Sequence, residues 1–399
     1  MMQTVTRKQM SLFFAAVALQ SLAANFAHPI TPTIIQDLGL PDYMFGLAFA
    51  GMSFTCFLFS PFWGKISTFL SSRAVLLISN LGYAAGQWLF AISTTVETIL
   101  AARLIAGFFV GGVSVCVLTY VINCSPMGTR AKDLTIVATL TTVFAAFGYM
   151  VGGVLGAYSI PFTFALQVVL LCVSGACFYF WMKNDQLDER RPTKQELLRE
   201  ANPFISFLEV RDLLCKVFVI LFVVVLLSSI ASTAYDQCFN YFIKDQFHFS
   251  SAYNGLLRAI VGFISLAANA TICMWIIRNR DVKHSLIWIF AIGAVTLGAM
   301  ILVEDVILFI IINLIFFAIN AIYIPLLQDV VAKSATHENS GVLMGFYNAI
   351  KSLGMIFGSL FAGFIYVYGA KLSFLYAGIF FAVSAFLMVW YCRHFKTEK

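Results

Sequence analysis

Charged residues are scarce in this 399-residue chain: Asp, Glu, Lys and Arg make up only 11% of it, against roughly 25% in soluble domains. Hydrophobic residues make up 61% and include 41 Phe. A chain with so much apolar surface would aggregate in water. The composition therefore excludes an ordinary soluble enzyme, a disordered chain and a collagen-like fibre. It indicates a protein whose solvent is the lipid bilayer.

Other absences narrow the function further. The sequence contains no GxxxxGK(S/T) stretch, so ATP is not expected to drive this chain. The nine Cys residues are scattered without a CxxC pair, which argues against a metal site or a disulfide framework. The apolar segments contain no Ser/Lys or Ser/His pair at the same depth in the membrane that could act as nucleophile and base. The sequence also shows no soluble output domain. We expect neither an enzyme nor a sensor, and we expect no cofactor, no metal and no nucleic-acid partner.

The apolar residues are arranged in segments that are long enough to cross a membrane. A spanning helix needs about 20 such residues, and the length of the chain accommodates twelve helices with short connections. We place the spans at 10–36, 43–67, 73–92, 96–123, 134–157, 161–182, 213–243, 251–277, 284–302, 306–332, 340–368 and 371–392. The predicted fold class is an all-α integral membrane protein with twelve transmembrane helices.

The positive charges indicate how the chain is oriented. Of the 25 Lys and Arg residues, 20 fall in loops on the side of the N-terminus, two in the opposite loops and three inside spans. Because positive loops stay in the cytoplasm, both termini are predicted to be cytoplasmic, in the cell membrane. The one long polar stretch, 183–212, is a predicted cytoplasmic linker between an N-terminal half at 1–182 and a C-terminal half at 213–399.

The two halves share a glycine pattern. Gly148 and Gly152 in the fifth span recur as Gly354 and Gly358 in the eleventh, at an offset of 206 residues. Paired six-helix halves are typical of transporters built from parallel repeats. The spacing alone is weak evidence, because small residues four apart are a general packing device between membrane helices. We predict two pseudo-symmetric six-helix halves.

Several motifs at span ends resemble those of a known family. They are Pro29-x-x-Pro32 followed by Asp37-Leu38-Gly39, Ser60-Pro61-Phe62-Trp63-Gly64, Arg103-x-x-x-Gly107, Ser125-Pro126 followed by Arg130, and the set Gly148, Gly152, Gly153 and Gly156. On these motifs the chain resembles the major facilitator superfamily over its whole length, and within it the twelve-span bacterial drug:proton antiporter branch. The resemblance implies the major facilitator fold and assigns the Arg103 and span-five motifs to coupling, helix packing and conformational change.

The sequence departs from this family pattern in two places. The loop after the second span has Thr68, Phe69 and Ser71 where the family normally has Asp, Arg and Gly, which weakens the usual cytoplasmic charge lock. In the fifth span, Gly153 takes the place of the usual Pro.

Asp236 is the candidate proton carrier. It lies in the seventh span, about 10 Å inside the outer end at 1.5 Å per residue, where a carboxylate is costly unless it is paired, protonated or facing water. The resemblance adds that quinolone-efflux antiporters carry an acid at the matching place. Arg258 lies at a similar depth in the eighth span, so a permanent Asp236–Arg258 ion pair is the alternative. Arg103 is interpreted either as a polar hub or as a coupling residue.

Other polar residues inside the spans predict a central substrate cavity, because such groups usually face the protein interior. The candidates are Gln20, Asn25 and His28 in the first span, Tyr235 in the seventh, Asn320 and Tyr323 in the tenth, and Lys351 in the eleventh. Pro29 and Pro32 are expected to bend the first span. Lys351 either faces the substrate or extends along its stem toward the cytoplasm.

The leading functional hypothesis is proton-coupled efflux of hydrophobic or amphipathic small molecules by alternating access. The alternative is proton-coupled uptake or exchange of a small anionic metabolite, because Arg103, Arg258 and Lys351 outnumber Asp236 inside the spans. The expected partners are a small-molecule substrate, protons and the lipid bilayer, and the chain is expected to be a monomer.

Overall fold

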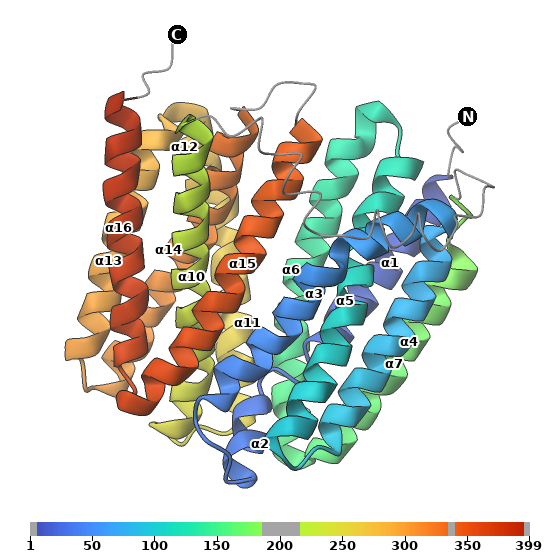
Figure 1. Cartoon of the computed structure of the whole chain (residues 1–399), viewed down its shortest axis with the longest axis horizontal. Coiled ribbons are helices and arrows are strands. Elements are labelled where there is room, and N and C mark those ends of the chain that lie inside the picture. Colours follow the sequence, from blue (N-terminus) through green and yellow to red (C-terminus); the bar gives the residue numbers. More distant parts are fainter. Residues whose placement is uncertain (1–5, 186–215, 334–339, 395–399) are drawn as a thin grey trace. The chain divides into compact units, whose positions relative to one another are not determined.

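The computed structural model describes residues 6–185, 216–333 and 340–394, and helices account for most of them (Figure 1). The N-terminal helices are α1 (Arg7–Ala24), α2 (Thr31–Asp37), α3 (Met44–Phe69), α4 (Ser72–Ala91), α5 (Val96–Cys124), α6 (Met127–Tyr158) and α7 (Ile160–Trp181). The later helices are α10 (Lys216–Asp245), α11 (Ser251–Ala268), the π-helical turn η2 (Asn269–Cys273), α12 (Met274–Asn279), α13 (Val282–Leu302), α14 (Val306–Lys333), α15 (Ser340–Tyr368) and α16 (Leu372–His394). The all-α prediction is confirmed. The predicted linker 183–212 lies outside the described residues from 186 onward.

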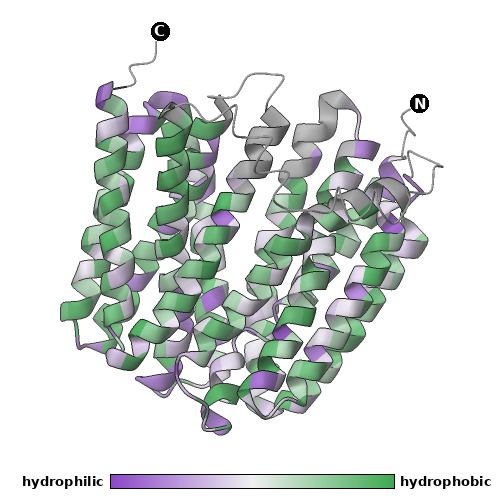
Figure 2. Cartoon of the chain, in the orientation of Figure 1, coloured by the Kyte–Doolittle hydropathy of each residue, from purple (hydrophilic) through white to green (hydrophobic). Residues whose placement is uncertain are grey.

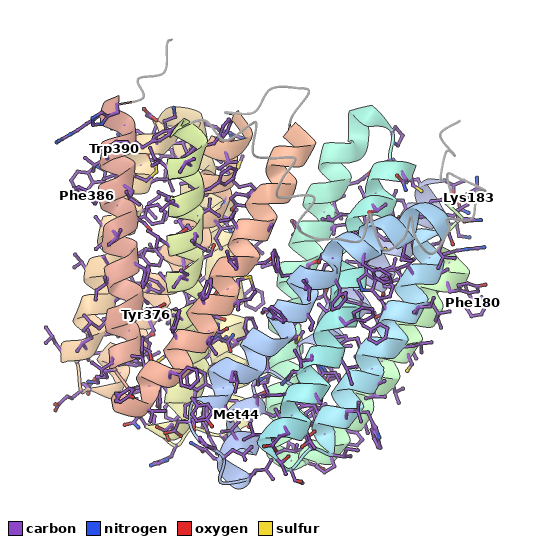
Figure 3. The ribbon with its side chains drawn as sticks, viewed as in Figure 1. Met44, Phe180, Lys183, Tyr376, Phe386 and Trp390 are labelled. Atoms are coloured by element: carbon purple, nitrogen blue, oxygen red, sulfur yellow. The ribbon has the colours of Figure 1, made fainter. Side chains whose placement is uncertain are left out.

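The helices have the length and composition of membrane spans. Within the described ranges, ten helices are long and apolar enough to cross a bilayer, and α3 contributes a shorter apolar stretch at Met44–Ser60. Hydrophobic residues extend along the helices, and hydrophilic ones gather toward the helix ends (Figure 2). Phe180 and Phe386 project outward (Figure 3) and are 78% and 69% exposed, as expected for side chains that face lipid. The chain is a multi-pass membrane protein, and the count of twelve spans stays a prediction.

The first predicted span, 10–36, is interrupted rather than continuous, at the place where Pro29 and Pro32 predict a bend. The chain leaves the helix at Asn25 and enters α2 only at Thr31. Pro29 explains the interruption, because it has no backbone N–H to donate and its ring clashes with the preceding helical turn. Pro32 is tolerated because it stands in the first turn of α2, where the N–H groups have no helical partner.

Contacts divide the described residues into two compact units. Unit 1 comprises 6–40, 51–185 and 249–259, and unit 2 comprises the remaining described residues. The helices pack by the same scheme in each unit. In unit 1, α4 packs against α5 and α7, and α1 packs against α6 and α7. In unit 2, α13 packs against α14 and α16, and α10 packs against α15 and α16 (Figure 1).

Each unit contains the first part of a helix that continues in the other. The beginning of α3 belongs to unit 2, where the Tyr241 hydroxyl donates a 2.6 Å hydrogen bond to Asp42 and Gly46 approaches the backbone of α15 at Gly363. The beginning of α11 belongs to unit 1, where Gly255 approaches Gly153 of α6. The two units therefore differ from a simple cut of the chain at the linker.

The glycines of the shared pattern make corresponding contacts in the two units. They are Gly148 and Gly152 on α6 against Leu22 and Phe26, and Gly354 and Gly358 on α15 against Leu226 and Ile230. In every case an added Cβ atom would meet backbone atoms of the facing segment. The pattern thus sets how closely α6 and α15 approach their neighbours.

Asp185 caps the beginning of α4. Ser71 caps this helix without a side-chain hydrogen bond. Instead, one carboxylate oxygen of Asp185 accepts from the Ser72 backbone N–H at 2.7 Å, and the other accepts from the Ser72 hydroxyl at 2.6 Å and the Asn123 amide at 3.1 Å. Asp185 is only 5% exposed, so water does not compete for these donors.

We expect Asp185→Ala to destabilise the protein by about 2 kcal/mol, because it leaves buried donors without their charged acceptor. Thermal unfolding of the purified protein measures the effect as a lower midpoint. Glu304→Ala, which removes an exposed carboxylate between α13 and α14, is the matched control and should leave the midpoint unchanged. An Asp185→Ala variant as stable as the control would show that the capping contributes nothing.

Candidate functional site

Residues 25–30, between the end of α1 and the beginning of α2, form a polar joint that contacts with other helices stabilise. Ending α1 frees backbone carbonyls that need donors. The Tyr83 hydroxyl donates to the Ala24 carbonyl at 3.0 Å, and the Gln167 side chain donates to the Ala23 carbonyl at 3.0 Å. Helices α4 and α7 thus supply the donors that let the chain break here.

The beginning of α11 also holds the joint within unit 1. The Asn254 amide donates to the Pro29 carbonyl at 3.4 Å, and the hydroxyls of Thr33 and Ser251 lie 3.0 Å apart. Asn254 is 2% exposed. These contacts explain why a segment so distant in sequence belongs to unit 1.

Arg103 lies beside the joint on α5. It is 4% exposed, its guanidinium carbon lies 3.8 Å from the centre of the Phe90 ring, and one terminal nitrogen donates to the Thr31 hydroxyl at 3.2 Å. Its Nε atom is buried and has no hydrogen-bond acceptor among the described residues. Arg103 therefore keeps an unused donor in a buried position.

Gly107 holds the helix that carries Arg103 close to α3. A Cβ atom at this position would meet the Met52 carbonyl and the Thr55 hydroxyl. The same Thr55 hydroxyl donates to the Leu104 carbonyl at 2.8 Å. The Arg103-x-x-x-Gly107 motif thus places a buried cation on α5 one turn before the glycine that allows α5 to approach α3 closely.

Gly153 and Gly255 form the crossing of α6 and α11. A Cβ atom at Gly153 would lie 2.8 Å from the Gly255 Cα atom, so only glycine fits without backbone movement. Gly156, one turn further along α6, packs against Ile30. Gly153, the departure from the family pattern, therefore makes room for a helix of the other half of the sequence.

The crossing brings Arg258 onto Tyr149. The guanidinium carbon of Arg258, which is 8% exposed, lies 5.4 Å from the centre of the Tyr149 ring. That ring is stacked on His28 of the joint, with ring centres 5.4 Å apart and planes 11° apart. Arg103 contacts the same joint where it enters α2, through its hydrogen bond to Thr31. We call Arg103, Arg258, His28 and Tyr149 the arginine cluster.

Asp236 lies on a polar face of α10 in unit 2. Ser229, Ser232, Asp236 and Asn240 follow one another at intervals of three or four residues, which places them on one side of a helix. Asp236 is half-buried, and Ser229 and Asn240 are buried. Because Arg258 belongs to unit 1, the Asp236–Arg258 ion pair stays a prediction based on depth.

Two of the predicted cavity residues lie in the aromatic core of unit 2. The Tyr235 hydroxyl donates to the Asn313 side chain at 2.7 Å, and its ring centre lies 4.2 Å from that of Phe316. The Tyr323 hydroxyl donates to the Ser228 carbonyl at 3.3 Å. Both tyrosines are almost completely buried.

The other predicted cavity residues belong to both units. Asn25 caps the end of α1 and donates to the Ser21 carbonyl at 2.8 Å. Gln20 on α1 and Lys351 on α15 are partly exposed. Asn320 on α14 has a buried side-chain oxygen with no hydrogen-bond partner among the described residues. Within unit 1 the structure gathers Arg103, His28 and Arg258 around the joint, and the single central cavity stays a prediction.

Sequence reasoning missed Tyr149, Asn254 and the buried partners of Arg103. The available signal was the pair of glycines, Gly153 and Gly255, but nothing local indicated that these glycines face each other. The described residues include no group of three or more His, Cys, Asp or Glu side chains that could hold a metal ion.

The profile of the Major Facilitator Superfamily matches residues 13–334 and, in a second alignment, residues 221–398. The chain belongs to the Major Facilitator Superfamily. Multidrug resistance protein 1 of Bacillus subtilis (strain 168) is 22% identical over 92% of each chain. The class C tetracycline resistance protein of Escherichia coli is 25% identical over 90% of each chain.

Solved structures show that this superfamily member has the expected fold. The nucleoside transporter NupG matches with a TM-score of 0.75 at 14% identity, over 98% of this chain and all of its own. The D-xylose-proton symporter matches with a TM-score of 0.71 at 17% identity, over 95% of each chain. The major facilitator fold predicted from the sequence is confirmed, and the chain is a membrane transporter by family.

Proposed function

We propose that this superfamily member exports hydrophobic or amphipathic small molecules across the cell membrane in exchange for protons. The observation that carries the proposal is the half-buried carboxylate of Asp236 on the polar face of an otherwise apolar α10. The multidrug and tetracycline resistance relatives support the direction and the solute class. The chain works as a monomer, with both termini in the cytoplasm.

Asp236 acts as the proton carrier in this proposal. A carboxylate on a membrane helix can be neutral or charged at modest cost when it faces polar groups, and Ser229, Ser232 and Asn240 provide them. Protonation from the outside and release to the cytoplasm, in alternation with outward solute movement, would couple the two fluxes. Arg103 and Arg258 contribute positive charge to the transport machinery, and Asn320 offers an unused acceptor to a solute.

Export of a lipophilic dye from intact cells tests this function. Cells that make the protein should extrude the dye faster than cells that make Asp236→Asn, and a proton uncoupler should abolish the difference. Inward accumulation of a small anionic metabolite, with no dye export, would instead support the alternative of uptake. Dye export that persists in the uncoupler would contradict proton coupling.

A further inference from the structure

We propose that the arginine cluster binds an anionic group of the transported solute, with Arg103 making the direct contact. This inference rests on the proposed export function and adds a chemical class: amphipathic molecules that carry a carboxylate beside an aromatic or aliphatic body. It concerns residues of unit 1 only.

The first argument is the charge of Arg103. A guanidinium remains protonated in proteins, and a buried charge is costly unless it is paired. Among the described residues, the partners of Arg103 are the neutral Thr31 hydroxyl and the Phe90 ring. Neither partner carries a negative charge. An anion that reaches Arg103 would therefore form an ion pair with a guanidinium that these contacts do not neutralise.

The second argument is the geometry of the donors. A guanidinium has five N–H donors in a planar fork, and a carboxylate can accept from two of them side by side. The contact with Thr31 uses a terminal nitrogen, whereas the buried Nε atom of Arg103 lacks an acceptor. The Phe90 ring lies against the guanidinium and restricts its orientation. The remaining donors of Arg103 are thus oriented before any solute binds.

The third argument is the neighbourhood of Arg103. Arg258 supplies a second cation, and its guanidinium carbon lies 5.4 Å from the centre of the Tyr149 ring. The Tyr149 ring, stacked on His28, provides an aromatic surface beside the Arg258 guanidinium. The Phe90 ring does the same beside Arg103. Aromatic faces next to a guanidinium suit a molecule with an anionic end and an apolar body, whereas a lipophilic cation would be repelled.

Equilibrium binding to the purified full-length protein tests the inference. The probes are naphthaleneacetate and naphthaleneacetamide, which share the ring but differ in charge. The variants are Arg103→Gln, Arg103→Lys and, as a matched control, Arg280→Gln, which removes an exposed guanidinium stacked on Trp275. Intrinsic fluorescence gives the Kd of each probe, and size-exclusion chromatography confirms that each variant is folded.

The wild type should bind the carboxylate at least about tenfold more tightly than the amide, equivalent to about 1.4 kcal/mol. Arg103→Gln should abolish this preference by weakening only carboxylate binding. Arg103→Lys, which keeps the charge but lacks the planar fork, should retain part of the preference. Arg280→Gln should match the wild type.

Three outcomes would overturn the anion site: no preference in the wild type, binding of neither probe, or an equal loss for both probes in folded Arg103→Gln. If Arg103→Gln does not fold, the test uses folded Arg103→Lys. A carboxylate-over-amide preference equal to that of the wild type would then show that the planar guanidinium does not bind the carboxylate. Dye export in cells separates the two proposals. Normal export without carboxylate preference rejects only the anion site, whereas carboxylate preference without any proton-dependent export rejects only the proposed function.

Discussion

Replacing Asp236 by Asn should abolish uphill export while the protein remains folded and still binds its solute. The amide keeps the shape and polarity of the side chain, so its neighbours Ser229, Ser232 and Asn240 on the polar face of α10 retain a polar contact. It cannot exchange a proton at physiological pH. Without that exchange, solute movement has no link to the proton gradient.

The expected size of the effect follows from the energy of one proton. Moving one charge across 100 mV is worth about 2.3 kcal/mol, which sustains a solute gradient of roughly 50-fold at 1.4 kcal/mol per tenfold. Proteoliposomes with an imposed gradient should show such accumulation with the wild type and none with Asp236→Asn. Glu304→Gln, an exposed carboxylate, is the control and should behave as the wild type. Undiminished accumulation by Asp236→Asn would exclude this residue as the coupling acid.

Replacing Gly152 by Ala should destabilise unit 1 by about 1–3 kcal/mol, because the new methyl group overpacks a closed helix contact. The added Cβ would lie 2.8 Å from the Phe26 carbonyl carbon and even closer to its oxygen, and these backbone atoms cannot rotate away. Since α6 carries Tyr149, the displacement should also separate that ring from His28 and impair transport.

Gly298→Ala is the matched control, because an added Cβ at this helical glycine has no atom within 4 Å. Thermal unfolding and dye export should both be normal in this variant. Gly358→Ala, the counterpart of Gly152→Ala in unit 2, should lower the unfolding midpoint by a comparable amount, since its Cβ would lie 3.0 Å from the Ile230 Cα atom. If Gly152→Ala matched Gly298→Ala, the α6 contact would be looser than the structure describes.

The resemblance of the two glycine patterns could be found from the sequence because both repeats preserve the same spacing along one helix. Their partners could not be found in this way. Gly153 is informative in a different sense: the sequence showed only that a Pro was missing, and the structure shows that α11 occupies the space beside it. A departure from a motif can therefore reflect contact with a helix that is distant in sequence.

The first predicted span shows the opposite limit. Pro29 and Pro32 predicted a bend, but whether a chain bends or breaks depends on donors for the carbonyls that a break exposes. Tyr83 and Gln167 supply those donors from helices far along the chain. The hydropathy of residues 10–36 contains no information about them.

The sequence by itself determined that this protein is a multi-pass helical membrane transporter of a recognisable superfamily. Hydropathy and glycine spacing are properties of residues that are close in sequence, so they can be recognised without knowledge of the fold. Only the tertiary structure decided that Arg258 lies against the Tyr149 ring. It also decided that Asp185 caps α4 and that Arg103 has a buried N–H donor without an acceptor among the described residues. These features arise where helices remote in sequence pack together, so no local pattern encodes them.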